Sequence, residues 1–206
     1  MSEKRFPLEF LHAEALCREM PSCGAVVVFT GKAGAIPDAL KCLYPQSHSR
    51  VFYMEDTMEN RLPEILSAVE KLHVPCLVMH PQDLPGMGAF LPSDARVSLV
   101  SRGTETPDHL SVLLDKSMPD YFTWIGFQRY LANPAVLEKL SDHYIETLRL
   151  GEFRKNHLAA EPLLREATHH FIDMRCIRHA DLPEVKHGNP NGLYAEEICA
   201  LARYMG

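Results

Sequence analysis

The sequence predicts an α/β fold in which a mainly parallel sheet is covered by helices on both faces. Ala25–Phe29 is a continuous apolar run rich in β-branched residues, which is typical of a strand buried on both sides. Between residues 59 and 73, apolar side chains recur at helical spacing. Runs of both kinds alternate along the chain, and this alternation is the usual way in which parallel sheets are built.

The first half of the chain supplies three strands and three helices. Residues 1–23 read as a charged N-terminal extension with a short helix. The helix over 59–73 carries Pro63 near its first turn, where proline is tolerated. We therefore expect helices over 8–20, 37–43 and 59–73, and strands over 25–29, 50–54 and 75–79.

The second half repeats this pattern. Asn133 and Pro134 open a helix, because asparagine caps a helix well and proline suits its first position. The chain then ends with a strand that terminates in an acid, a polar loop and an amphipathic helix. We expect strands over 96–101, 121–126, 144–147 and 170–173, and helices over 106–114, 133–143, 160–167 and 193–204.

Length and composition restrict the class of protein. A chain of 206 residues without repeats or a clear linker fits one domain over residues 1–206. The net charge of −6 argues against nucleic-acid binding, which needs a clustered positive surface. No apolar run reaches the roughly 18 residues of a membrane span, and the first residues lack the apolar segment of a signal peptide. We expect a cytoplasmic protein whose six scattered cysteines are reduced.

Two local patterns suggest sites but favour structural interpretations. The segment 30–34, TGKAG, follows a strand, yet Lys32 is followed by Ala33 where a phosphate loop needs Ser or Thr. We interpret it as a strand-to-helix turn. His169 and His170 are adjacent in a strand, where neighbours point to opposite faces, so they cannot chelate one metal ion together.

Two polar residues follow strands at the sheet edge where α/β proteins usually place their sites. His80 follows the strand over 75–79, and Asp173 ends the last strand. A lone carboxylate in that position binds a metal, caps a helix or pairs with Arg175 or Arg178. The basic loop that follows is, by default, a solvated surface.

Five segments of the second half point to a known family: WIGFQRY at 124–130, RLGEFR at 149–154, EPLLR at 161–165, FID at 171–173 and NGLYAEE at 191–197. They resemble the ureohydrolases, which include arginase, agmatinase and formimidoylglutamase, and the likeness is greatest to a bacterial formimidoylglutamase-like branch. It is good over residues 119–206 and collinear but weaker over 24–118.

The resemblance implies a three-layer α/β/α domain with an arginase-like, mainly parallel sheet. Active members of the family hold two manganese ions at the carboxyl ends of strands through two histidines and four aspartates. These hard ligands suit manganese. The bridging hydroxide attacks a guanidinium or amidine carbon and releases urea or formamide.

Compared with the family, this chain lacks most metal ligands in the first two motifs. Gln82 stands where the first motif has its histidine, and His80 lies two positions away. The second motif, Asp-x-His-x-Asp, matches residues 103–107 best, with Glu105 at the histidine position. Neither aspartate of that motif is present.

The third motif, Asp-x-Asp-x-x-Asp, retains one ligand. It reads Asp173, Arg175 and Arg178 at its three positions, so cations replace two carboxylates. We expect these charges to occupy the vacated metal positions, with a salt bridge from Asp173 to one of the two arginines. Such a pair offsets its own desolvation only if it is well hydrogen-bonded.

The departures favour a non-catalytic binding or regulatory module that needs no cofactor. The alternative is an active metal-dependent hydrolase of guanidino or formimino C–N bonds, with manganese and an altered site around His80, Glu105 and Asp173. An unrelated α/β domain is a third possibility. The candidate pocket comprises His80, Gln82, Glu105, Arg175 and Arg178.

The expected partners follow from the same resemblance. The two arginines suggest a small anionic or amino-acid-like ligand, and neither nucleic acid nor a membrane is expected. The family continues beyond the helix over 193–204 with at least one more strand and helix, which are missing here. A bare sheet edge or packing surface tends to be covered by a partner chain, so we expect a homo-oligomer.

Overall fold

The computed structural model divides the chain into two compact units, Met1–Leu84 and Pro85–Gly206. We call them the N-terminal unit and the C-terminal unit and describe each by itself. The prediction that they form one domain stays a prediction. The structure describes residues 8–10, 23–30, 34–41, 50–55, 61–79, 91–92, 94–104, 119–185 and 188–205.

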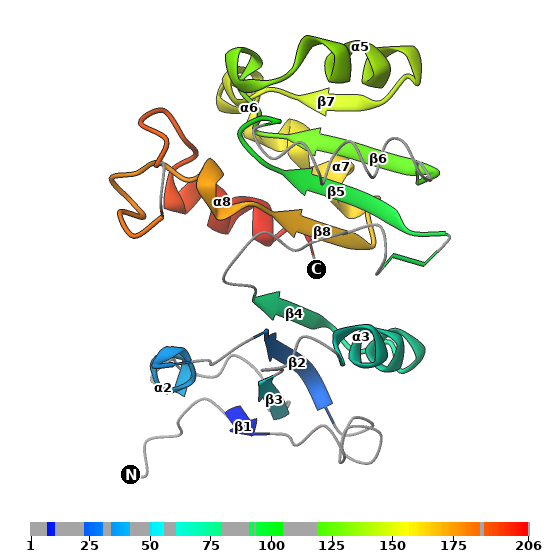
Figure 1. The fold of residues 1–206 in the computed structure, drawn as a ribbon, viewed down its shortest axis with the longest axis vertical. Helices are drawn as coiled ribbons and strands as arrows, with labels where there is room; N and C mark the ends of the chain where they lie inside the picture. Colours follow the sequence, from blue (N-terminus) through cyan, green and yellow to red (C-terminus); the bar gives the residue numbers. More distant parts are fainter. Residues whose placement is uncertain are drawn as a thin grey trace. The chain divides into compact units, whose positions relative to one another are not determined.

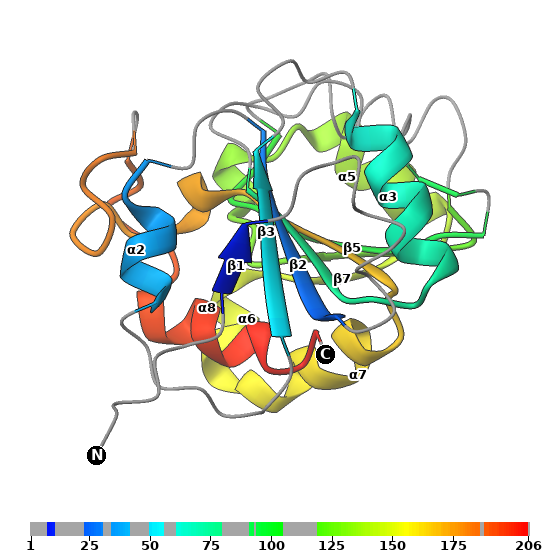
Figure 2. The same cartoon turned by 90° about the horizontal axis from the view of Figure 1, so that it is seen from below.

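The N-terminal unit is a four-stranded parallel sheet with the order β1-β3-β2-β4 (Figure 1). Alternate residues of the central strands point to opposite faces, and helices α2 and α3 lie on opposite sides of the strands (Figure 2). Val26 and Val28 pack with Ile65 of α3, whereas Val27 lies in a separate cluster. The elements are β1 Leu8–Phe10, β2 Cys23–Phe29, α2 Ile36–Lys41, β3 Arg50–Glu55, α3 Leu62–Lys71 and β4 Cys76–Met79.

The first strand corrects one prediction. We expected a helix to begin at Leu8, but Leu8–Phe10 pairs with β3 as a parallel strand. The pairing is reinforced by an ion pair between Glu9 Oε2 and Arg50 Nη2 at 2.7 Å. Tertiary pairing therefore overrides the local pattern in these three residues. Residues 11–20, the rest of the expected helix, lie outside the described residues, as does the helix expected over 106–114.

The C-terminal unit contains a second four-stranded parallel sheet with the order β7-β6-β5-β8 (Figure 1). Helix α5 lies on one face, and α6, α7 and α8 lie on the other (Figure 2). The α/β class and the helices on both sheet faces are as predicted. The elements are β5 Arg96–Val100, β6 Tyr121–Ile125, α5 Pro134–Asp142, β7 Glu146–Leu148, α6 Leu150–Lys155, α7 Ala160–Arg165, β8 His169–Ile172 and α8 Ala195–Ala202.

The larger core of this unit lies between the sheet and α6, α7 and α8. Val100, Ile125 and Leu148 pack there against Phe153 and Leu164. On the opposite sheet face, Trp124 is fully buried, stacks on Phe127 with 4.3 Å between ring centroids, and donates from Nε1 to Ser101 Oγ at 2.8 Å. Because Trp124 is the only tryptophan of the chain, its fluorescence reports on this unit alone.

None of the helices in the described part of the chain has the length and apolar character that a bilayer crossing requires. The predicted helix boundaries at Asn133 and Pro134 are confirmed. The Asn133 side chain accepts from the backbone N–H of Ala135, as a cap should, and Pro134 is the first residue of α5.

We expect the stability of the C-terminal unit to depend on pH through His170. Its Nδ1 lies 2.7 Å from the hydroxyl of Ser98, which is fully buried on the neighbouring strand. Burial, and then the charge of His169, lower the pKa of His170. The folded state therefore binds fewer protons than the unfolded state just below the usual histidine pKa of about 6.5, so stability falls as the pH drops through that region.

We expect His170→Gln to remove this fall in stability at low pH, because glutamine keeps a hydrogen-bonding side chain but does not titrate. Urea unfolding followed by Trp124 fluorescence at several values between about pH 5 and 7.5 measures the slope. His143→Gln, which changes an exposed histidine, is the control. An equally steep loss of stability in His170→Gln and in the unchanged protein would contradict the assignment.

Candidate functional site

The four strands of the C-terminal unit end together at one edge of the sheet. The strand pairing places Leu148, Ile125, Val100 and Ile172 side by side in one row across the sheet. The loops that follow these residues therefore begin at the same edge, which is where parallel sheets usually place their sites. The polar residue that immediately follows β8 is Asp173.

The carboxylate of Asp173 is held by Arg175. Arg175 Nε donates to Oδ1 at 2.8 Å and to Oδ2 at 3.1 Å, and the backbone N–H of Arg175 donates to Oδ1 at 2.9 Å. About three quarters of each side chain is buried. Asp173 also caps the short 3-10 helix Met174–Cys176. The predicted salt bridge between Asp173 and one of the two arginines is confirmed, and the partner is Arg175.

Arg178 makes a separate ion pair. Its Nη2 donates to Asp181 Oδ1 at 2.6 Å, and Asp181 Oδ2 accepts from the backbone N–H of Ala195 at 3.1 Å. The hydrogen bond from Arg178 lowers the pKa of Asp181. Arg178 thus ties the loop after β8 to the start of α8 and does not contact Asp173 in the way that Arg175 does.

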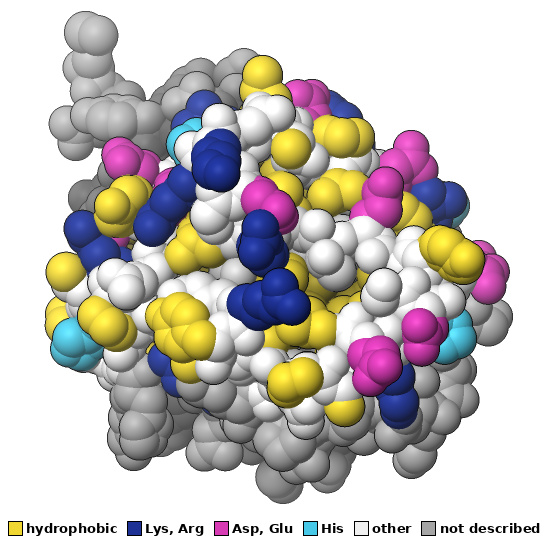
Figure 3. Space-filling view, turned by 90° about the horizontal axis from the view of Figure 1, so that it is seen from above, with side chains coloured by type: hydrophobic (Ala, Val, Ile, Leu, Met, Phe, Trp, Pro, Cys, Tyr) yellow, Lys and Arg dark blue, Asp and Glu magenta, His cyan; other side chains and the backbone are white. Residues whose placement is uncertain are grey.

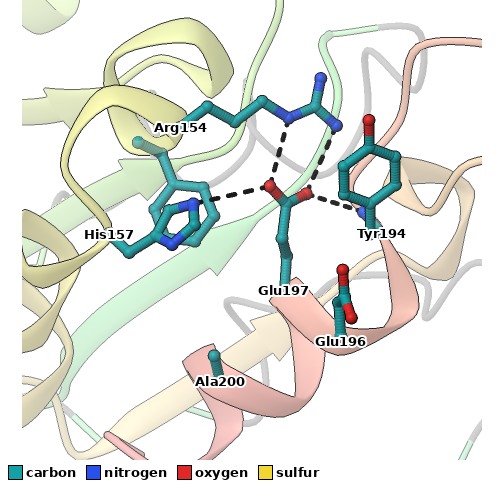
Figure 4. Close-up of a pocket in the computed structure, with 7 residues that line it drawn as sticks. Arg154, His157, Tyr194, Glu196, Glu197 and Ala200 are labelled. Carbon is teal, nitrogen blue, oxygen red and sulfur yellow. Dashed lines mark hydrogen bonds and ion pairs between the residues drawn. The ribbon is translucent and has the colours of Figure 1, made fainter.

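A cluster of charged and aromatic side chains joins α6 to α8 (Figure 4). Arg154 Nε and Nη2 donate to the two oxygens of Glu197 at 3.2 and 3.3 Å, and Nη2 also donates to the carbonyl of Gly192 at 2.8 Å. The backbone N–H of Tyr194 donates to Glu197 Oε2 at 2.7 Å. Glu197 is only 6% exposed, so its charge is compensated within the protein.

Two guanidinium groups lie against the ring of Tyr194. The central carbons of Arg154 and Arg178 are each 4.5 Å from the ring centroid, within the range of a cation–π contact. Tyr194 therefore connects the Arg154–Glu197 pair to the Arg178–Asp181 pair. These contacts tie Arg178 and Asp181, in the loop after β8, to α6 and to the start of α8.

Next to this cluster lies an open hollow of about 480 Å³. Buried Phe153 lines it, and the His157 ring packs on Phe153 with 4.7 Å between centroids. His157 Nε2 lies 3.7 Å from Glu197 Oε1. Figure 4 shows Arg154, His157 and Tyr194 arranged around the Glu197 carboxylate. Because this carboxylate is already bound by Arg154, the hollow has no free buried charge of its own.

The described residues do not fit a two-manganese centre. Both oxygens of Asp173 accept hydrogen bonds from the guanidinium of Arg175, the residue that the resemblance aligns with the next metal ligand. Among the described residues, no group of three or more His, Cys, Asp or Glu side chains could hold a metal ion. Nearby Cys176 is buried, and burial raises the pKa of its thiol, which makes it a poor ligand.

The structure therefore brings together only part of the predicted pocket. Asp173 and Arg175 form one pair, and Arg178 belongs to another. His80, Gln82 and Glu105 lie outside the described residues. Sequence reasoning missed the roles of Arg154, Tyr194 and Glu197. Two acids in the first turn of α8, Glu196 and Glu197, were the available signal, because acids there stabilise the start of a helix.

Comparisons with known proteins agree with the fold. No protein-family model matches the chain, and no curated protein matches its sequence. Among solved structures, a Trypanosoma cruzi formiminoglutamase with Mn²⁺ is similar, at 18% identity and a TM-score of 0.69, over 87% of this chain and 79% of that chain.

Two further solved structures extend the similarity. An arginase superfamily protein from T. cruzi is 18% identical, with a TM-score of 0.72 over 98% of this chain and 85% of that chain. A T. brucei arginase-like protein is 12% identical, with a TM-score of 0.53 over 98% of this chain and 75% of that chain. The chain therefore has an arginase-like α/β fold. The resemblance to ureohydrolases is confirmed at the level of the fold.

Proposed function

We propose that this chain is an arginase-fold protein that works without a two-manganese centre, as a non-catalytic binding module. The observation that carries the proposal is the pair between Asp173 and Arg175. A carboxylate at a position where the family binds metal is here bonded to a guanidinium from two residues away.

Coulomb's law indicates how strongly this pair opposes a metal ion. Two unit charges about 4 Å apart interact by about 4 kcal/mol at an effective dielectric constant of about 20, and a divalent ion doubles the effect. The fixed cation of Arg175 therefore disfavours a dication at Asp173 by several kcal/mol. Each 1.4 kcal/mol corresponds to about a tenfold change in affinity.

The alternative is a metal-dependent hydrolase of guanidino or formimino compounds. The similar T. cruzi structure is a formiminoglutamase with Mn²⁺. At 18% identity this similarity supports the fold, and the activity does not transfer with it. The replacement of carboxylates by Arg175 and Arg178 in the third motif favours the non-catalytic function.

Calorimetric titration of the purified full chain with Mn²⁺ and Zn²⁺ tests the proposal, together with measurement of the metal content. We expect no stoichiometric binding near neutral pH and no hydrolysis of guanidino or formimino compounds. Tight binding of one or more ions, accompanied by such hydrolysis, would overturn the proposal in favour of the hydrolase.

A matched pair of variants tests the role of Arg175. Arg175→Asp removes the cation and adds a carboxylate beside Asp173, so we expect Mn²⁺ affinity to rise at least about tenfold. Arg165→Asp makes the same change of charge at an exposed residue at the end of α7, and we expect no such gain. An equal effect of the two substitutions would show that Arg175 does not control access to Asp173.

A further inference from the structure

An arginine follows each strand of the C-terminal unit. In the loops after the strands, the described segments 101–104, 126–131, 149 and 173–175 contain four arginines and a single acid, Asp173. Two of these arginines are ion-paired, Arg175 with Asp173 at 2.8 Å and Arg149 with Glu152 of α6 at 2.6 Å. The arginines are Arg102 after β5, Arg129 after β6, Arg149 after β7 and Arg175 after β8.

The strand pairing keeps these loops close together. Leu148, Ile125, Val100 and Ile172 form one row, and neighbouring strands lie about 4.8 Å apart. Four strand ends therefore span roughly 15 Å. The loops are also bonded to each other, because the backbone N–H of Gln128 donates to the carbonyl of Arg102 at 2.8 Å.

The arginines at the middle and at the β8 end of this row differ from ordinary surface cations. Arg102 is only 8% exposed, and the Arg175 side chain is 25% exposed. The loops that hold Arg102 and Arg175 follow the paired strands β5 and β8, and the backbone N–H of Asp173 donates to the carbonyl of Val100 at 2.9 Å. Arg102 therefore belongs to the loop that begins next to the one holding the Asp173–Arg175 pair.

A buried donor lies at the same edge. Gln128 is 7% exposed, and its Oε1 accepts from the hydroxyl of Tyr130. Its Nε2 is buried, with no hydrogen-bond partner in the part of the chain that the structure describes. Buried donors in native proteins are nearly always satisfied by protein, water or a ligand. Figure 3 shows another face of the molecule, seen from above Figure 1, on which basic and acidic side chains lie among hydrophobic ones.

We propose that this edge binds a small oxyanion, a phosphate or carboxylate group, between Arg102, Gln128 and Arg175. The proposal rests on the proposed function, because it gives the binding module its class of ligand. A guanidinium has five N–H donors in a planar fork, so an arginine paired with one carboxylate can also bond the oxygens of a second anion. Gln128 Nε2 supplies a neutral donor from the loop after β6, whose backbone is bonded to that of Arg102.

Calorimetric titration of the full chain with inorganic phosphate, and separately with succinate, tests the proposal. Both are carried out in excess EDTA, so that a metal-bound anion cannot contribute. At anion concentrations up to about 10 mM, an affinity of about 1 mM gives a clear signal. We expect one anion per chain, and the anion that binds more tightly identifies the source as phosphate or carboxylate.

Three variants locate the site. Arg102→Gln and Gln128→Leu should each weaken binding at least about tenfold, the size expected from losing one good hydrogen bond to a charged group. Gln128→Leu keeps the test valid if the buried Arg102 cannot be replaced without unfolding. Arg165→Gln removes an exposed arginine that pairs with Glu161 and should change the affinity less than twofold.

Absence of binding by both anions, or binding that neither Arg102→Gln nor Gln128→Leu weakens, would overturn the oxyanion site. The anion titration and the metal titration test different proposals, so either proposal can fail without the other. A chain that binds neither metal nor anion keeps its non-catalytic assignment and loses only this ligand class. A chain that binds manganese tightly and hydrolyses guanidino or formimino compounds loses the proposed function itself.

Discussion

Glu197→Ala is expected to destabilise the C-terminal unit by roughly 2–3 kcal/mol. The substitution removes a carboxylate whose side chain is 6% exposed. This carboxylate accepts hydrogen bonds from Nε and Nη2 of Arg154 and from the backbone N–H of Tyr194. The guanidinium then loses its partner at the start of α8. Because Arg154 is 32% exposed, water restores part of its solvation, and we expect less than the full cost of breaking a buried pair.

Glu196→Ala is the matched control for this prediction. Glu196 is the preceding residue on the same helix and is exposed, so its removal should change the stability by no more than about 0.5 kcal/mol. Urea unfolding followed by Trp124 fluorescence measures the free energy of unfolding of the C-terminal unit, which contains both substituted residues. Equal stability of the two variants would mean that the Arg154–Glu197 pair does not hold α6 to α8.

Gly192→Ala should destabilise the same unit by about 3 kcal/mol or prevent its folding. A Cβ at this position would lie 2.4 Å from the carbonyl oxygen of Cys176 and 2.5 Å from the backbone nitrogen of Arg178. Both neighbours are backbone atoms of a paired segment, since Ile177 and Leu193 form a parallel bridge. The segment can make room for a methyl group only by breaking that pairing.

Gly151→Ala provides the contrast. Gly151 lies exposed in α6, where a Cβ would meet nothing within 4 Å. Alanine is the better helix former, so we expect a gain of up to about 1 kcal/mol. Circular dichroism and unfolding by urea, applied to both glycine variants, measure the difference. A loss of stability in Gly151→Ala, or none in Gly192→Ala, would contradict the packing assigned to these segments.

Much of the secondary structure could be predicted because its signals are local. The apolar run at 25–29 forms β2, and the helical spacing over 59–73 forms α3. The Asp173–Arg175 pair was also predictable, since the two residues are only two positions apart at the end of a strand. By contrast, Tyr144 has a φ of 55° in a segment expected to be a strand, and β7 begins two residues later. That turn allows Ile145 to bond back to Leu140 before the strand starts.

The sequence by itself determined the α/β class, the order of most strands and helices along the chain, and which residues stand at positions that the resemblance aligns with metal ligands, among them Gln82, Arg175 and Arg178. These follow from periodicity and residue identity, which need no knowledge of distant neighbours. Only the tertiary structure decided the role of Glu197, whose partner Arg154 is 43 residues away, and the contact of Ser98 with His170 across 72 residues. Strand order and helix packing set those meetings, and no local pattern encodes which distant residues a fold will bring within hydrogen-bonding distance.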